Sequence, residues 1–337
     1  YIPSATWATT SNCNITGVTS TIPTGFNQTF GNVTWNSTGQ NSHLSLAGSL
    51  QTVQGNLTIN STGNRSLRLL NAATIYLPIT IGGNLVQTGG MLYLYGTDIL
   101  TGGSVEVSVI GNLDISGGTL NLHGNTDATS SSTLNIQGNI NISGGSITET
   151  GNGTVQLNCN GTSEQIYTKT AGTISNTINV SILSNAIVNF GTSILDGSNG
   201  NFILQSDATI KTAHAQGISI TGATGSVQVT GARTYSAGAN YVYTGTVAQI
   251  TGLGLTQNNP KNLTIQSTNT VSLSANTSIS GDLLIAQGTL STSASNYSFT
   301  LNGNFTNNGS FNANGSVVSF VGNTHTYING TSATAFR

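Results

Sequence analysis

Charged side chains are scarce in this chain, because Lys, Arg, Asp and Glu make up only 5% of its 337 residues. An ordinary soluble domain carries about 25% of these residues. The formal net charge is −2, and the seven basic residues are scattered singly along the chain. Nucleic-acid binding requires clustered Lys and Arg, so the sequence predicts no nucleic-acid partner.

Long apolar runs are also missing. No run reaches the ~18–20 residues of a membrane-spanning helix, and no helical stripe or basic amphipathic helix occurs. The sequence therefore predicts no membrane insertion.

The chain begins at Tyr1 without Met or a signal peptide, so we expect a processed or excised piece. Abundant Asn, Thr, Ser and Gly with little Lys or Glu indicate an extracellular or cell-surface protein.

The chain does contain an internal repeat, in which Gly-Asn is followed by an apolar residue. Strong copies begin at Gly55, Gly83, Gly111 and Gly138, so the motif returns at a nearly constant spacing. Weaker and more closely spaced copies begin at Gly281 and Gly303. A period of roughly 22–28 residues is typical of one coil of a β-solenoid.

Each coil contains three short alternating segments. Residues 83–110 divide into NLVQ, MLYLY and SVEVSV, and residues 111–137 divide into NLDIS, GGTLNLH and STLNIQ. Apolar–polar alternation buries one face of a strand. We therefore predict an all-β parallel β-helix with three short strands per coil, Gly-Gly corners and about 13 coils ~4.8 Å apart. A string of immunoglobulin-like sandwiches is the alternative, but the regular return of Gly-Asn favours the solenoid.

The asparagine of each strong copy has a structural interpretation. Stacked coils align these side chains into a ladder in which each amide bonds to the next, as in other stacked β structures. The predicted structural ladder consists of Asn56, Asn84, Asn112 and Asn139.

A longer repeat is superimposed on the coils. Segment 240–267 is echoed near the C-terminus and, more faintly, at 155–182 and 11–37. We predict one continuous solenoid over residues 1–337, with longer units of roughly 1–40, 41–182, 183–267 and 268–337. The last unit stops part-way, so we expect a longer parent chain that continues beyond Arg337.

The two cysteines, Cys13 and Cys159, align in this longer repeat with Tyr243 and Phe320 at an inward-facing position. They would lie about five coils, or roughly 25 Å, apart. A disulfide requires Cα atoms within about 7 Å of each other. The sequence therefore predicts two buried, reduced thiols.

The segment VYTGTVAQITG with the following NLTI, and VSLSANTSISGDLLIAQGTL at 271–290, carry a family resemblance. They resemble the repeat units of large surface proteins from Bacteroidetes, and the resemblance covers most of residues 150–337. It implies an adhesin or cell-surface fibre that is exported by the type IX secretion system.

Catalysis on this fold is usually polysaccharide cleavage. A hydrolase needs carboxylates about 5–10 Å apart, and a lyase needs a base and a group that neutralises the uronate, often a metal with Arg or Lys. The nine acidic residues are scattered singly, and only coil stacking would bring Asp98 or Glu106 near Asp127. We therefore predict no enzyme activity, no catalytic or metal-binding residue, and no cofactor. The histidines lack metal-ligand spacing and are expected at surface or corner positions: His43, His123, His214 and His325.

The leading hypothesis is a non-enzymatic structural or adhesive segment of a long extracellular surface protein or filament. Its candidate partners are glycans or solid surfaces, bound by weak multivalent contacts. End-to-end or lateral self-association is also expected, since no solenoid cap is evident.

Two alternatives stay open. One is a carbohydrate-binding or carbohydrate-active β-helix protein, which exposed aromatic side chains on one face would favour; Tyr93, Tyr95 and Tyr243, however, lie in alternating segments where core packing is equally expected. The other is an ice-binding β-solenoid, which needs Thr-X-Thr on every coil, whereas TKT at 168–170 is an isolated example.

Overall fold

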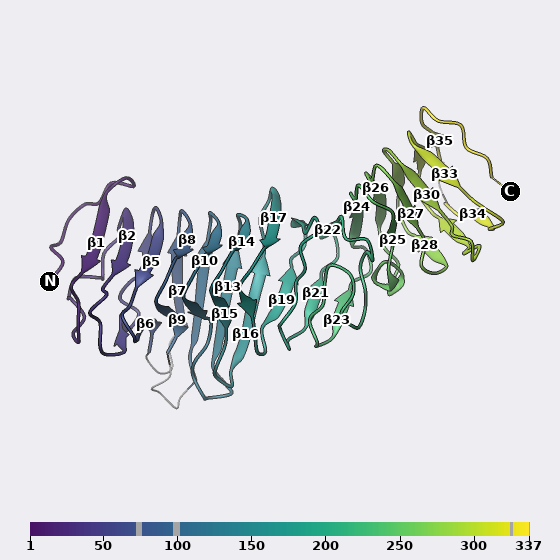
Figure 1. Ribbon diagram of the computed structural model, residues 1–337. Coiled ribbons are helices and arrows are strands. Elements are labelled where there is room, and N and C mark those ends of the chain that lie inside the picture. Colours follow the sequence, from purple (N-terminus) through teal and green to yellow (C-terminus); the bar gives the residue numbers. More distant parts are fainter. Residues whose placement is uncertain (72–75, 97–101, 324–325, 337) are drawn as a thin grey trace. The chain divides into compact units, whose positions relative to one another are not determined.

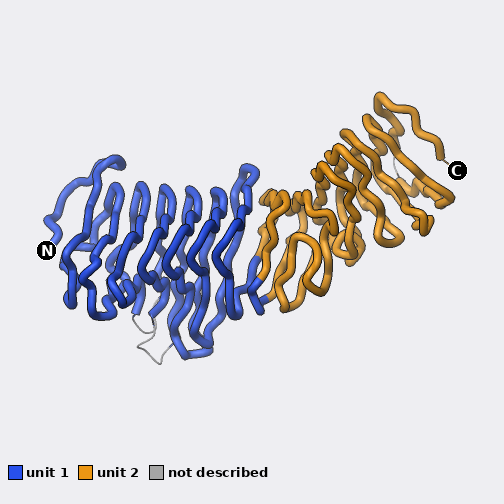
Figure 2. The backbone as a smooth tube through the Cα atoms, in the orientation of Figure 1, with its two compact units in different colours: residues 1–180, 197–200 blue, residues 181–196, 201–337 orange. Residues whose placement is uncertain are grey.

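The computed structural model describes residues 1–71, 76–96, 102–323 and 326–336, so that Asp98, His325 and Arg337 lie outside the described residues. The chain forms short parallel strands wound into stacked coils (Figure 1), which confirms the predicted all-β parallel β-solenoid. Two compact units can be distinguished (Figure 2). Unit 1 comprises Tyr1–Val180 and Gly197–Gly200, and unit 2 comprises Ser181–Asp196 and Asn201–Arg337.

Unit 1 contains three parallel sheets. The first sheet pairs β1 (Asn12–Thr16), β2 (Asn32–Asn36), β5 (Leu57–Ser61), β8 (Leu85–Gln87), β11 (Leu113–Ile115), β14 (Ile140–Ile142) and β17 (Glu164–Lys169) in that order. The second sheet pairs β4 (Thr52–Val53), β7 (Tyr76–Ile81), β10 (Ser104–Val109), β13 (Ser131–Ile136) and β16 (Thr154–Cys159). The third sheet pairs β3 (Leu44–Ser45), β6 (Ser66–Leu70), β9 (Met91–Tyr95), β12 (Thr119–Asn121), β15 (Ser146–Thr148) and β18 (Thr173–Ile174).

From β2 onwards, successive strands of unit 1 belong to the three sheets in turn, as the alternating segments of residues 83–137 predict. The inward side chains of the first sheet form a continuous column: Leu57, Leu85, Leu113, Ile140 and Tyr167 pair in register. Each of these side chains is at most 4% exposed. Burying one such apolar side chain stabilises the fold by about 1.5–3 kcal/mol, so this column is a main source of stability.

The corners after the first sheet depend on glycine. Gly118 has a φ of +71°, and a Cβ there would lie 2.4 Å from the carbonyl oxygen of Gly90, one coil away. Only glycine tolerates both the left-handed backbone and this close approach. Gly90 and Gly145 also have positive φ, which confirms the predicted Gly-Gly corners at these places.

Unit 2 is built from shorter strands, which contain at most four residues each. One sheet pairs β20 (Ile187–Asn189), β22 (Thr209–Thr212), β24 (Asn240–Tyr243), β26 (Asn262–Ile265), β29 (Leu283–Ile285), β32 (Phe305–Asn307) and β35 (Ile328–Asn329). A second sheet pairs β21 (Phe202–Leu204) with β23 (Arg233–Tyr235). A third pairs β25 (Gln249–Ile250), β27 (Thr270–Ser272), β30 (Thr289–Ser291) and β33 (Ser310–Asn312) in that order. A fourth pairs β28 (Thr277–Ile279), β31 (Phe299–Leu301) and β34 (Val318–Phe320). The strand β19 (Asn179–Ile182) contains the boundary between the units.

The coils of unit 2 vary more in length than predicted. Leu263 pairs with Leu283 across a short coil, whereas Thr209 pairs with Asn240 across a much longer one. The long coil contains an additional loop around Ser219 and Gly222, which Arg233 holds in place. Arg233 is buried, and its guanidinium donates to Ser219 Oγ at 2.7 Å and to the Gly222 carbonyl at 2.6 Å. The range of coil lengths predicted from the Gly-Asn spacing is therefore too narrow.

A 3₁₀ turn, η1 (Leu253–Thr256), follows β25 at the place where the next coils of unit 2 have a third strand, β28 or β31. Such turns are common as short connectors. The expectation of three strands in every coil is consequently wrong for this coil, and also for the coils that begin with β1, β20 and β22, which contain only one or two strands. The predicted long units stay a prediction, although the boundary between the two compact units lies close to the boundary predicted at residue 182.

Candidate functional site

The four predicted ladder asparagines lie at one corner of unit 1, directly before β5, β8, β11 and β14. The Oδ1 atom of each accepts a 2.8 Å hydrogen bond from a main-chain N–H in the next coil. The N–H of Asn84, for example, donates to Asn56 Oδ1, and that of Asn139 donates to Asn112 Oδ1. The ladder begins at Asn32 and ends at the N–H of Ile166. The predicted amide-to-amide bonding is therefore wrong, because each side chain bonds to the main chain where the coil turns.

Unit 2 has a corresponding ladder that contains an aspartate. Asn262 Oδ1 accepts from the N–H of Asp282 at 2.8 Å, and Asp282 Oδ1 accepts from the N–H of Asn304 at 2.7 Å. An oxygen acceptor is thus what the position requires, whether it belongs to an amide or a carboxylate. These ladders stabilise the stacking of coils.

Replacing Asn112 tests this interpretation. Asn112→Ala leaves the Asn139 N–H without an acceptor and should lower the free energy of unfolding by about 1–3 kcal/mol. Asn112→Asp keeps the acceptor and should cost less than about 0.5 kcal/mol. Tryptophan fluorescence during urea unfolding measures both, since Trp7 and Trp35 are the chain's two tryptophans and both lie in unit 1. Equal losses for the two variants would contradict the ladder.

Cys13 and Cys159 are free and buried, with exposed fractions of 6% and 3%. Burial raises the pKa of both thiols, that of Cys159 to about 12, so neither forms the thiolate that reacts at neutral pH. Their predicted equivalence is wrong, since Cys13 lies in the first sheet and Cys159 in the second. Because the coils differ in length, residues that align in the longer sequence repeat can lie in different sheets of the solenoid.

One histidine, His123, does not lie at the surface position that the sequence predicts for it. His43 is exposed and His214 half-buried, but His123 is fully buried. Its Nδ1 and Nε2 atoms lie 2.7 and 2.8 Å from the hydroxyls of Ser132 and Ser130. These two partners, on or next to β13, compensate the burial of the imidazole.

No group of three or more His, Cys, Asp and Glu side chains that could hold a metal occurs in the described part of the chain. Of the acidic residues weighed for catalysis, Glu106 pairs in register with Thr133. Asp127 lies before β13, and its Oδ1 accepts from Thr129 N–H at 2.8 Å. The register and hydrogen bonds thus give these two carboxylates different partners.

The alternation along each strand determines which aromatic side chains are buried and which are exposed. Tyr95 and Tyr243 are fully buried, and Tyr93 is half-buried. Tyr76, which the sequence interpretation did not single out, is 59% exposed on the outer side of β7. The alternation of YLPITI contained the signal, because Leu77, Ile79 and Ile81 are the inward residues and Tyr76 therefore lies on the outer face.

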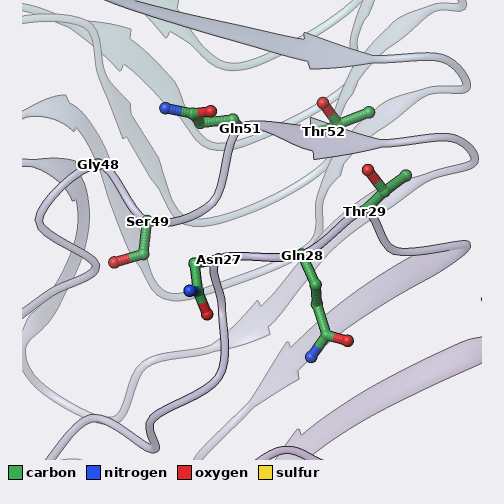
Figure 3. Close-up of a pocket in the computed structure, with 7 residues that line it drawn as sticks. All are labelled: Asn27, Gln28, Thr29, Gly48, Ser49, Gln51 and Thr52. Carbon is green, nitrogen blue, oxygen red and sulfur yellow. The ribbon is translucent and has the colours of Figure 1, made fainter. Parts of the chain in front are cut away.

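A polar pocket of about 320 Å³ lies in unit 1 beside the bridge between Phe30 and Val53. The residues just before the two bridged positions, within 27–29 and 48–52, supply the walls (Figure 3). The residues that line the pocket are Asn27, Gln28, Thr29, Gly48, Ser49, Gln51 and Thr52. None carries a charge.

Gln28 is held in place on one wall of this pocket. Its Oε1 accepts from Trp7 Nε1 at 3.0 Å, and its Nε2 donates to the Gly25 carbonyl at 2.7 Å. By contrast, the side chains of Asn27, Ser49 and Gln51 make no hydrogen bond to the described residues. The pocket therefore offers free amide and hydroxyl groups to a neutral ligand.

Comparison with protein-family models, with curated proteins and with solved structures gave no match. Within the described ranges, no helix is both long and apolar enough to cross a membrane.

Proposed function

We propose that this chain is a non-enzymatic structural and adhesive segment of a long extracellular surface protein or filament. The observation that carries the proposal is the outward row of the first sheet in unit 1. Its members follow one another in register: Asn14, Thr34, Thr58, Val86, Asp114, Asn141 and Thr168. Five of these seven side chains are neutral and carry hydrogen-bonding groups.

Parallel coils repeat this row about every 4.8 Å, so one chain presents many weak contacts at fixed spacing. Such contacts add up to strong attachment when they engage together. The stacked apolar column and the asparagine ladder stiffen the support that holds them. Glycans and hydroxylated solid surfaces are the partners that suit these groups, and association with further copies of the chain belongs to the same proposal.

Adhesion to an uncharged hydroxylated film tests the proposal. The intact chain should attach to a cellulose film on a quartz-crystal microbalance, and its affinity should change less than twofold between 0.05 and 0.5 M NaCl, because neutral contacts are not screened by salt. The proposal fails if the chain attaches neither to a cellulose film nor to a silica film. It also fails if 0.5 M NaCl removes the chain from cellulose.

The polar pocket favours carbohydrate binding as a second candidate function. Its free amides and hydroxyls match the hydroxyl groups of a neutral sugar, and its uncharged lining does not attract an ion. The outward row gives no comparable support to ice binding, because Val86 and Asp114 interrupt its threonines.

A further inference from the structure

The outer face of the second sheet in unit 1 carries a fixed carboxylate. Tyr76 Oη donates to Glu106 Oε2, and Asn135 Nδ2 donates to Glu106 Oε1 at 2.7 Å. Asn158 Nδ2 in turn donates to Asn135 Oδ1 at 2.8 Å. These bonds join four neighbouring strands, β7, β10, β13 and β16, and they hold Glu106 in one orientation.

Glu106 has no cationic partner among the described residues, since both of its oxygens accept from neutral groups. An ionised carboxylate has about four lone-pair sites, and these bonds use two of them. The remaining sites can accept from ligand hydroxyls, and such charge-assisted bonds are stronger than neutral ones. An anionic ligand, by contrast, would meet an uncompensated negative charge.

Tyr76 provides a flat surface next to this carboxylate. The hydrogen bond to Glu106 raises the pKa of Tyr76, so its hydroxyl stays a donor at neutral pH. The side chain is 59% exposed, which leaves its ring available to an apolar surface. Further along the sheet, the outward positions are hydroxyls and amides: Ser104, Ser131, Thr133, Thr154 and Gln156.

We infer that Tyr76 and Glu106 form a binding site for a neutral polysaccharide. A sugar ring has an apolar C–H surface edged by hydroxyl groups, so it can stack on Tyr76 while a hydroxyl donates to Glu106. The chain of sugars then continues over the hydroxyls and amides of β10, β13 and β16. This inference rests on the proposed adhesive function and assigns it a site and a class of ligand.

Affinity electrophoresis tests the site with three probes: hydroxyethyl cellulose and galactomannan as neutral polymers, and polygalacturonate as an acidic one. The intact chain should be retarded by at least one neutral polymer and at least threefold less by polygalacturonate. Tyr76→Ala and Glu106→Gln should each weaken neutral binding at least fivefold at an unchanged melting temperature. The matched control is Tyr327→Ala, because Tyr327 is 63% exposed and has no acidic hydrogen-bond partner among the described residues.

Three results would overturn the inference: no retardation by either neutral polymer, equal retardation by polygalacturonate, or variants that bind as well as the unaltered chain. The adhesive function is judged separately. If attachment to cellulose or silica films persists in any of these cases, only the site is wrong; if attachment is lost as well, both proposals fail.

Discussion

Replacing Gly118 by alanine should lower the free energy of unfolding of unit 1 by about 4 kcal/mol or more. Two penalties add at this corner. An L-residue in the left-handed conformation costs roughly 1–2 kcal/mol, and the new Cβ would meet the Gly90 carbonyl oxygen at 2.4 Å. That oxygen belongs to the adjacent coil, and it accepts the N–H of Thr119 at 2.8 Å, so it cannot move without breaking the stack.

Gly17 offers a matched control for this substitution. Its φ of +70° equals that of Gly118 within a degree, but a Cβ there would have nothing within 4 Å. Gly17→Ala should therefore show the backbone penalty alone, at about 1–2 kcal/mol. Urea unfolding followed by tryptophan fluorescence compares the two variants in the same unit. Similar losses for both would show that close coil stacking does not constrain Gly118.

Acidification from pH 7 to pH 4.5 should destabilise unit 1 by about 2–3 kcal/mol through His123. Burial lowers the pKa of His123 from 6.5 to about 4, and each unit of difference is worth about 1.4 kcal/mol. The unfolded chain therefore binds the proton first. Stability from this group is complete above pH 6.5, and it is lost as the pH falls towards 4.

The variant His123→Gln isolates this effect. It should be less stable at pH 7, but the free energy of unfolding of unit 1 should lose most of its pH dependence between 6.5 and 4.5. Two titratable groups near this corner do not interfere in that range. Tyr95, whose ring centroid lies 5.1 Å from that of His123, has a raised pKa, and hydrogen bonds from Thr129 lower the pKa of Asp127. A change below about 1 kcal/mol in the unaltered chain would contradict the assignment.

Much of the fold follows from local sequence patterns. The alternation in residues 83–137 predicts β8 to β13, and the spacing from Gly55 to Gly138 predicts four successive coils. These patterns succeed because every coil repeats the same constraints, namely inward apolar residues, a ladder oxygen and a glycine corner. In unit 2 the coil length varies widely between one strand pair and the next, so spacing alone no longer identifies the face on which a residue lies.

The candidate sites were harder to predict because they depend on contacts between coils. The pocket needs residues 27–29 beside residues 48–52, a juxtaposition fixed by the bridge from Phe30 to Val53. Its Asn, Ser and Gln side chains resemble many others in a chain rich in such residues. His123 can be buried because its two ring nitrogens form hydrogen bonds with the hydroxyls of Ser130 and Ser132. No residue spacing in the sequence predicts that arrangement. Tyr76 alone could have been placed on the surface from its own strand.

The outward row of the first sheet is central to the proposed function, and its most direct test is adhesion after two charges are placed in it. A variant with Thr58→Glu and Thr168→Glu is compared with one carrying Thr21→Glu and Thr162→Glu, which are exposed residues of unit 1 outside the strands. On a cellulose film at 0.15 M NaCl, the row variant should adhere at least tenfold more weakly than the unaltered chain, and the control should change less than twofold. Equal adhesion of the two variants, at equal melting temperatures, would contradict the role proposed for this face.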